Sequence, residues 1–153
     1  MEQKKEVNGE AIAKSMFEMV KLKVPIISIV IGEGSSGGAL AIGVANKVYM
    51  MENAIYSILS PEGYSTILWK DSSRYKEAAE KMKLTSKDLY EMKVIDKIIK
   101  EPKQIDEKEF LRITENIKNE IVQEIKNFEK MNYEEIIENR YNKFRNISGF
   151  MEV

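Results

Sequence analysis

Residues 24–46 carry the sequence VPIISIVIGEGSSGGALAIGVAN, in which Glu33 is the only charged side chain. A run this apolar raises the question of a membrane span, but glycines and serines interrupt it at the centre, unlike the roughly 20 continuous apolar residues that a spanning helix needs. The aliphatic residues at 24–31 instead predict a parallel strand covered on both faces. The small apolar residues at 39–45 predict a helix buried on all sides. The stretch therefore predicts strand, glycine turn and buried helix.

The segments on either side of this stretch also predict alternating helices and strands. Apolar side chains at helical spacing predict an amphipathic helix over 10–22. Short runs at 47–51 and 55–59 predict two more strands. Ser60 followed by Pro61 predicts a helix reaching about residue 70, because the hydroxyl caps the first turn and proline suits the first helical position.

Four further helices are expected toward the C-terminus. The first is capped by Ser72 or Ser73, and the second covers residues 85–92. Two longer helices follow, opened by the capping-box spacings Asp106/Glu109 and Asn132/Glu135. The apolar side chains that share a face are Phe110, Ile113, Ile117, Ile121, Ile125 and Phe128 in the first helix, and Tyr133, Ile137, Tyr141 and Phe144 in the second.

Composition excludes several classes of protein. The 153 residues contain no cysteine and no histidine, and the formal net charge is −1. A disulfide framework, a Cys/His zinc site and a Ser-His-Asp machine therefore cannot be built from this chain. The balanced charge argues against electrostatically driven nucleic-acid binding. No signal-peptide pattern opens the chain, so a cytoplasmic protein with no membrane association is expected.

The glycine turn at 32–38 is compatible with a dinucleotide site. Gly32, Gly34 and Gly37 match G-x-G-x-x-G after a strand, and Glu52 lies where a ribose-binding acid would stand. Against this hypothesis, the helix is short and the chain continues without the further alternation of strands and helices that such a fold needs.

A second hypothesis places a serine nucleophile on the turn. Ser35 or Ser36 would attack and a lysine would act as the base, since no histidine exists. Lys47 is the nearest lysine downstream, but nothing in the sequence indicates that it is desolvated.

A third hypothesis is an oxyanion hole built from the backbone N–H groups of Gly37 and Gly38. Such donors stabilise charge that develops on an oxygen, without any titrating side chain. The plain structural alternative is that the glycines only permit a close approach of helix and strand.

A longer set of motifs resembles a known family. It runs from about residue 9 to residue 150 and consists of residues 24–26, 31–43, 56–63, 67–70, 78–80, 84–85, 89, 95–99, 101–102 and 139–141. These residues resemble the carboxyltransferase α subunit of bacterial acetyl-CoA carboxylase, of which the chain resembles only the C-terminal half.

The resemblance implies an α/β protein with a partial crotonase (ClpP-like) fold and a helical C-terminal extension. It implies a partial carboxyltransferase core over 1–104 and the extension, within the same domain, over 105–153. With so few strands, the chain is expected to leave a sheet edge and apolar faces unpaired.

The resemblance also implies a function. The family transfers CO₂ from carboxybiotin, carried on a biotin carboxyl carrier protein, to acetyl-CoA, giving malonyl-CoA for fatty-acid synthesis. The partner is a carboxyltransferase β subunit, which holds zinc, in an α₂β₂ heterotetramer. The Gly37 and Gly38 amides would hold the ureido oxygen of biotin. The isolated chain is expected to be inactive, and the rival hypotheses are a nucleotide-binding module using Gly32, Gly34 and Gly37, or a non-catalytic remnant that binds β.

Overall fold

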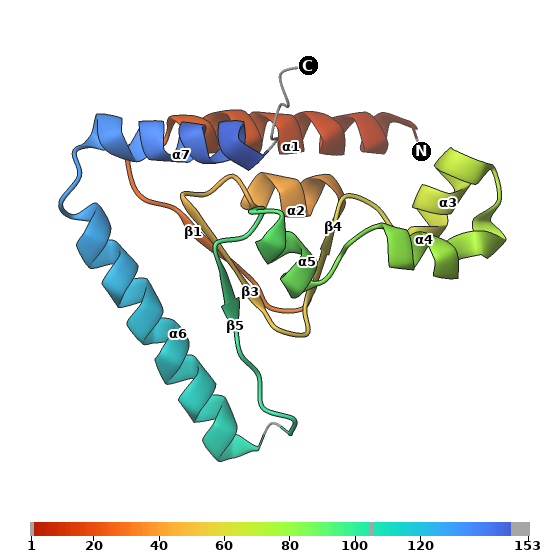
Figure 1. Ribbon diagram of the computed structural model, residues 1–153. Coiled ribbons are helices and arrows are strands. Elements are labelled where there is room, and N and C mark those ends of the chain that lie inside the picture. Colours follow the sequence, from red (N-terminus) through yellow and green to blue (C-terminus); the bar gives the residue numbers. More distant parts are fainter. Residues whose placement is uncertain (1, 105, 148–153) are drawn as a thin grey trace.

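The chain folds into a small parallel sheet with helices packed around it (Figure 1). The computed structural model describes residues 2–104 and 106–147. Residues 105 and 148–153 of the predicted extension lie outside the described residues. In chain order the elements are α1 (Glu2–Lys21), β1 (Ile27–Val30), β2 (Glu33–Ser35), α2 (Ser36–Ile42), β3 (Lys47–Met51), β4 (Ile55–Ser57), α3 (Pro61–Trp69), the 3₁₀ turn η1 (Ser72–Arg74), α4 (Tyr75–Lys81), α5 (Ser86–Glu91), β5 (Lys97–Ile99), α6 (Glu107–Phe128) and α7 (Tyr133–Ile147).

Two sets of parallel strands organise the molecule. The larger sheet has the order β1-β3-β5, and the smaller pairs β2 with β4. The buried core lies on β3 and the elements beside it, and it consists of Ala45, Val48, Tyr49, Met50, Met51, Ala54, Leu89, Ile95, Ile99 and Ile113. The parallel strands β1 and β3 fit the aliphatic runs that predicted them, although β1 is shorter than the expected 24–31.

Several local predictions are confirmed. Strand β3 has the predicted bounds. The Ser60 hydroxyl accepts a hydrogen bond from the Gly63 N–H and caps α3, as expected. Asn132 and Glu135 form the complete capping box, with each side chain accepting from the other residue's N–H at 2.9 and 2.8 Å.

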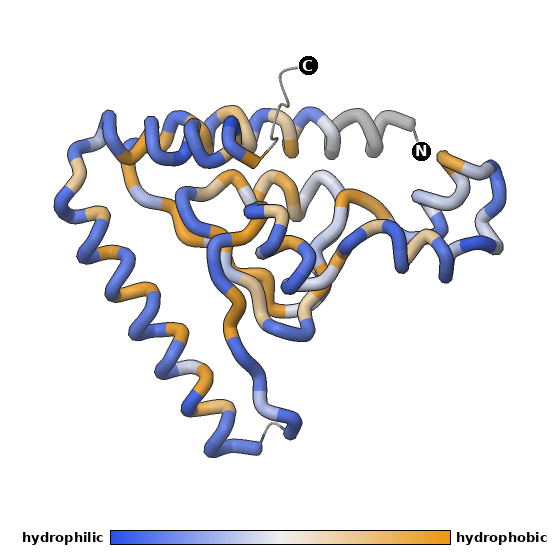
Figure 2. The backbone as a smooth tube through the Cα atoms, in the orientation of Figure 1, coloured by the Kyte–Doolittle hydropathy of each residue, from blue (hydrophilic) through white to orange (hydrophobic). Residues whose placement is uncertain are grey.

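Other predictions were wrong. Asp71, not Ser72 or Ser73, caps the η1 turn. Helix α2 is not buried on all sides, because Leu40 is 38% and Ile42 is 66% exposed. Figure 2 shows hydrophobic colour along this part of the chain. The helix is therefore apolar, as predicted, but it is only partly buried.

The apolar face that Tyr133, Tyr141 and Phe144 share on α7 is largely exposed, while Ile136 and Arg140 are buried. Arg140 is 1% exposed and fastens α7 beside α1, next to which Figure 1 draws it. Its guanidinium donates to the carbonyl oxygens of Met19, Val20, Leu22 and Val24 and to the side-chain oxygen of Asn46.

The buried Tyr49 hydroxyl yields a stability prediction. Tyr49 is 2% exposed, and its hydroxyl has no hydrogen-bond partner among the described residues. Burial, with the Glu124 carboxylate nearby, raises the pKa of Tyr49 far above its usual range. Because an unsatisfied buried hydroxyl is costly, Tyr49→Phe is expected to raise the free energy of unfolding by about 1 kcal/mol. Urea denaturation measures the change, with the exposed Tyr90→Phe as control; a less stable Tyr49→Phe protein would contradict the assignment.

Candidate functional site

The glycine turn is more ordered than a loop. After β1 the chain bends at Gly32 and forms β2, a strand that sequence analysis did not predict. Strand β2 pairs with β4 in the register Gly34↔Tyr56 and Ser35↔Ser57. The Ile55 N–H also donates to the Gly32 carbonyl oxygen at 2.9 Å. The turn is therefore anchored on β4 along its length.

The change from β2 to α2 occurs at Ser36. This residue has a φ of 64°, in the left-handed region that a residue with a side chain seldom adopts. The chain reverses there, so that the Gly37 and Gly38 N–H groups belong to the first turn of α2. Within a helix the N–H groups of the first turn have no carbonyl acceptor. The preceding Ser35 side chain, which stands at the capping position, does not accept from them either.

The two glycines differ in their surroundings. A Cβ at Gly37 would lie 3.5 Å from the Ile12 side chain of α1, whereas a Cβ at Gly38 would meet nothing within 4 Å. Gly37 is half-buried and Gly38 is exposed. Gly37 and Gly38, the predicted site residues, therefore lie together at the surface. Among the described residues, the Ser35 side chain does not accept from their N–H groups.

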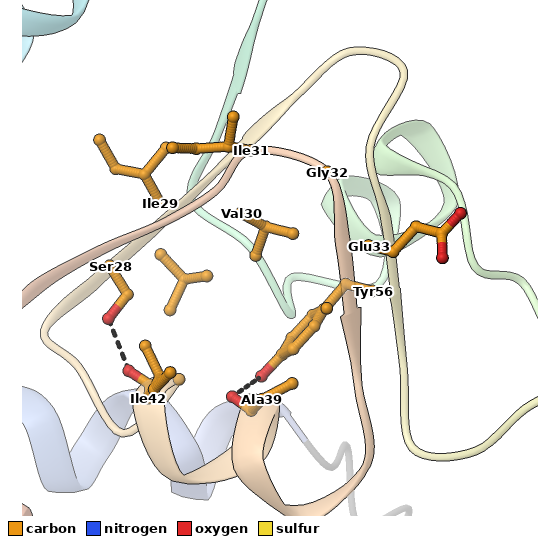
Figure 3. A pocket seen from close by; sticks show the side chains of 12 residues that line it. Ser28, Ile29, Val30, Ile31, Gly32, Glu33, Ala39, Ile42 and Tyr56 are labelled. Atoms are coloured by element: carbon orange, nitrogen blue, oxygen red, sulfur yellow. Dashed lines mark hydrogen bonds between the residues drawn. The ribbon is translucent and has the colours of Figure 1, made fainter.

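Two cavities lie behind the turn. The first, of about 170 Å³, is lined by Val30, Ile31, Gly34 and Ile42 among others (Figure 3). The second, of about 590 Å³, lies between α1, α2 and α7. Neither Gly37 nor Gly38 is among the lining residues of these two cavities. Figure 3 shows the Glu33 carboxylate directed away from the first cavity, so this carboxylate does not line its interior.

The structure does not assemble the serine–lysine pair. Lys47 pairs with Ile27 at the beginning of the parallel strands β1 and β3, while Ser35 and Ser36 follow the other end of β1. The Lys47 ammonium lies 3.9 Å from a Glu124 carboxylate oxygen. Ser35 Oγ has Ser57 Oγ as its neighbour at 3.4 Å. The structure therefore does not place Lys47 as the base of a serine nucleophile.

Glu52 is occupied by other contacts. Its carboxylate accepts from the Lys100 ammonium at 2.6 Å and from the Glu101 N–H at 3.2 Å. The hydrogen bond from Lys100 holds the pKa of Glu52 below its usual value. Both carboxylate oxygens are used within the fold, so a ribose hydroxyl would have to displace one of these contacts.

The structure adds Tyr56 to the site, a residue that sequence analysis had not connected with the turn. Its hydroxyl donates to the Ala39 carbonyl oxygen at 3.2 Å (Figure 3). Burial raises the pKa of Tyr56, which keeps this hydroxyl protonated and able to donate. The contact joins β4 to α2 across 17 residues of sequence, so no local sequence pattern predicts it.

Among the described residues no helix is both long and apolar enough to cross a membrane. The same residues include no cluster of three or more acidic side chains that could hold a metal ion.

The open parallel sheet and the glycine turn on a second small sheet give an α/β fold that is similar to that of known proteins. The similarity is visible in solved structures: a chain from the crystal structure of a Pseudomonas malonate decarboxylase hetero-tetramer in complex with coenzyme A matches with a TM-score of 0.59 and 14% identity. That match covers 72% of this chain and 46% of the other.

The chain belongs to the acetyl co-enzyme A carboxylase carboxyltransferase-like family, whose model matches residues 1–148. It is 51% identical over 144 residues to the acetyl-coenzyme A carboxylase carboxyl transferase subunit alpha of Clostridium acetobutylicum. It is 53% identical over 144 residues to the carboxyl transferase subunits beta/alpha of Natranaerobius thermophilus.

These matches cover 94% of this chain in both cases. They cover 53% of the Clostridium relative and 24% of the Natranaerobius relative. The chain therefore spans about half the length of an α subunit among its relatives.

Proposed function

We propose that this chain forms part of the α side of a carboxyltransferase that moves CO₂ from carboxybiotin to acetyl-CoA, giving malonyl-CoA in the cytoplasm. The observation that carries the proposal is the glycine turn. It falls inside a family match of nearly full length, and its Gly37 and Gly38 N–H groups belong to the first turn of α2, where the Ser35 side chain does not accept from them.

The amides of Gly37 and Gly38 act on the charge that forms during transfer. The bond between the biotin nitrogen and its carboxyl group breaks, the carboxyl group goes to the acetyl-CoA methyl carbon, and a proton from that methyl group goes to the biotin nitrogen. Negative charge builds on the ureido oxygen as the bond breaks. Donors already in place stabilise that charge more strongly in the transition state than in the ground state.

Three further components complete the activity in this proposal. A β subunit supplies zinc and most of the acyl-CoA site, and an α₂β₂ assembly brings the two sides together. A biotin carboxyl carrier protein delivers carboxybiotin. The name of the Natranaerobius relative, which joins beta and alpha subunits in one protein, supports the pairing with β.

The exposed surface supports a contact with the part of the α subunit that this chain does not match in its relatives. Strand β1 is at an edge of its sheet, and within the described residues its outer side pairs with no other strand. Apolar side chains near that edge are exposed: Val24 by 55%, Ile31 by 74% and Ile42 by 66%. An edge strand beside exposed aliphatic groups favours the addition of another strand. The part of the relatives that this chain does not match is the candidate for this added strand. Its addition would complete the partial crotonase (ClpP-like) fold.

The test is reconstitution. The chain is co-expressed with the part of the Clostridium acetobutylicum relative that it does not match, and with a β subunit. Biotin-dependent decarboxylation of malonyl-CoA, the reverse of transfer, is then measured. We expect turnover from the three polypeptides together and background turnover when this chain is omitted.

Two results would count against the proposal. A purified complex of all three polypeptides with no biotin-dependent turnover would contradict carboxyl transfer. Stoichiometric binding of NADH to the chain alone would favour the nucleotide-binding alternative, in which the same glycines receive a pyrophosphate.

A further inference from the structure

Tyr56 lies between the two elements that define the glycine turn. Its backbone is fixed in β4, opposite Gly34 of β2, and its N–H donates to the Leu84 carbonyl oxygen at 3.3 Å. Its side chain extends from there to α2, where the hydroxyl bonds the Ala39 carbonyl oxygen (Figure 3). Ala39 directly follows Gly38, so the tyrosine contacts the same helical turn that carries the donor amides.

The tyrosine ring occupies a slot that two glycines leave open. A Cβ at Gly34 would lie 3.0 Å from Tyr56 Cδ2, and a Cβ at Gly43 would lie 2.3 Å from Tyr56 Oη. Real side chains do not reach the second distance, so α2 and β4 can approach this closely only with glycine at position 43. The ring therefore acts as a spacer of fixed size between β4 and α2.

A second hydroxyl provides an internal comparison. Ser28 of β1 is 7% exposed, and its Oγ donates to the Ile42 carbonyl oxygen at 2.6 Å. That bond fastens the last residue of α2, away from Gly37 and Gly38. Ser28 thus holds the last residue of α2, whereas Tyr56 bonds Ala39 in the middle of the helix, one residue after Gly38.

We infer that Tyr56 is a positioning residue for the oxyanion site, its ring and hydroxyl setting where the Gly37 and Gly38 amides lie relative to β2 and β4. The inference rests on the proposed function for its catalytic consequence. The geometric part concerns this chain alone and is tested separately from turnover.

The geometric test uses the chain labelled with ¹⁵N-glycine, which contains eight glycines. Tyr56→Phe removes the hydroxyl and keeps the ring, and Ser28→Ala removes the hydroxyl that bonds Ile42, the last residue of α2. We expect the amide signals of Gly37 and Gly38 to shift in Tyr56→Phe and to stay in place in Ser28→Ala. Unmoved signals in Tyr56→Phe, or equal shifts in both variants, would overturn the inference.

A rescue experiment tests the slot. Gly43→Ala should move the Gly37 and Gly38 signals and lower the melting temperature, because the new methyl group would meet the tyrosine oxygen. Adding Tyr56→Phe removes that oxygen, so the double variant should recover most of both effects. If the double variant is as perturbed as Gly43→Ala alone, the tyrosine does not define the spacing.

The kinetic test uses the reconstituted enzyme. Small displacements of aligned groups are costly in rate, so Tyr56→Phe should lower kcat about tenfold while KM for the biotin substrate stays within about twofold. Ser28→Ala should show no such split. If the wild-type assembly is inactive, the proposed function is wrong, and the amide signals still test whether Tyr56 positions the glycine amides. If the assembly is active and Tyr56→Phe leaves kcat unchanged, the inference is wrong.

Discussion

Replacing Arg140 with alanine is expected to lower the free energy of unfolding by about 3 kcal/mol, the upper end of the cost of leaving a buried hydrogen-bonding group without its partner. The guanidinium is 1% exposed and no carboxylate pairs with it among the described residues. Burial lowers the pKa of Arg140, yet an arginine stays charged inside a protein. Its charge is balanced instead by oxygens of the backbone and of Asn46.

The loss is large because these oxygens come from separate elements. The Nη1 atom donates to the carbonyl oxygens of Met19, Val20 and Leu22 at 2.8–3.0 Å, at the end of α1. Carbonyl oxygens in the last turn of a helix generally lack an N–H donor from their own helix. The arginine supplies donors to them and so caps α1. The Nη2 atom reaches the Val24 carbonyl oxygen at 2.7 Å, just before β1. Alanine would remove the donor from four carbonyl oxygens and from the buried Asn46 side chain at once.

Asn46 extends the same junction to the sheet. Its Oδ1 accepts from Arg140 and from the Ile26 N–H, and its Nδ2 donates to the Ile136 carbonyl oxygen at 2.8 Å. Arg140 and Asn46 therefore hold α1, β1, β3 and α7 at one point. Arg140→Lys keeps a charge but cannot reproduce the planar fork, so an intermediate loss of stability is expected.

The matched control is Arg112→Ala on α6. Arg112 bonds Glu109 of the same helix, and its side chain is 60% exposed. Exposed pairs of this kind contribute little, so a change within about 0.5 kcal/mol is expected. Urea denaturation is followed by far-UV circular dichroism and by fluorescence of Trp69, the single tryptophan, which lies in the distant α3 helix. Equal losses in the two variants would show that Arg140 is not a structural junction.

Local chemistry was predictable from the sequence where the deciding residues are close in the chain. The Ser60 cap, the Asn132–Glu135 capping box and the aliphatic run of β3 depend on contacts within a few residues. The burial of Arg140 in α7 was not predicted, because a periodicity count treats arginine as exposed, whereas Arg140 finds its partners about 90 to 120 residues earlier in the chain. Strand β2 was missed because a glycine-rich segment is depleted in strand-forming residues.

The candidate site also has some features that the local sequence predicts and others that depend on distant contacts. The position of the Gly37 and Gly38 amides followed from a strand, a turn and a helix in sequence order. The roles of Tyr56 and Gly43 depend on how closely β4 and α2 approach, which only three-dimensional packing determines. The exposure of Ile42 was also unpredictable from this sequence, because an apolar helix looks buried whether its cover belongs to the same chain or to another.

Removing one amide donor from the turn is expected to reduce transfer by about 10²–10³-fold, the usual loss when one oxyanion-hole donor is deleted. Gly38→Pro makes this change, because proline lacks an N–H and is tolerated in the first turn of a helix. A Cβ at this position would meet nothing within 4 Å, so a side chain as small as alanine fits there. Gly38→Ala fills the same space and keeps the amide, and it should stay within about tenfold of wild-type turnover. Biotin-dependent malonyl-CoA decarboxylation by the reconstituted enzyme gives kcat for both variants, and circular dichroism shows whether each has folded. A folded Gly38→Pro enzyme that turns over as fast as Gly38→Ala would mean that the ureido oxygen is stabilised elsewhere, and the assignment of these amides would have to be abandoned.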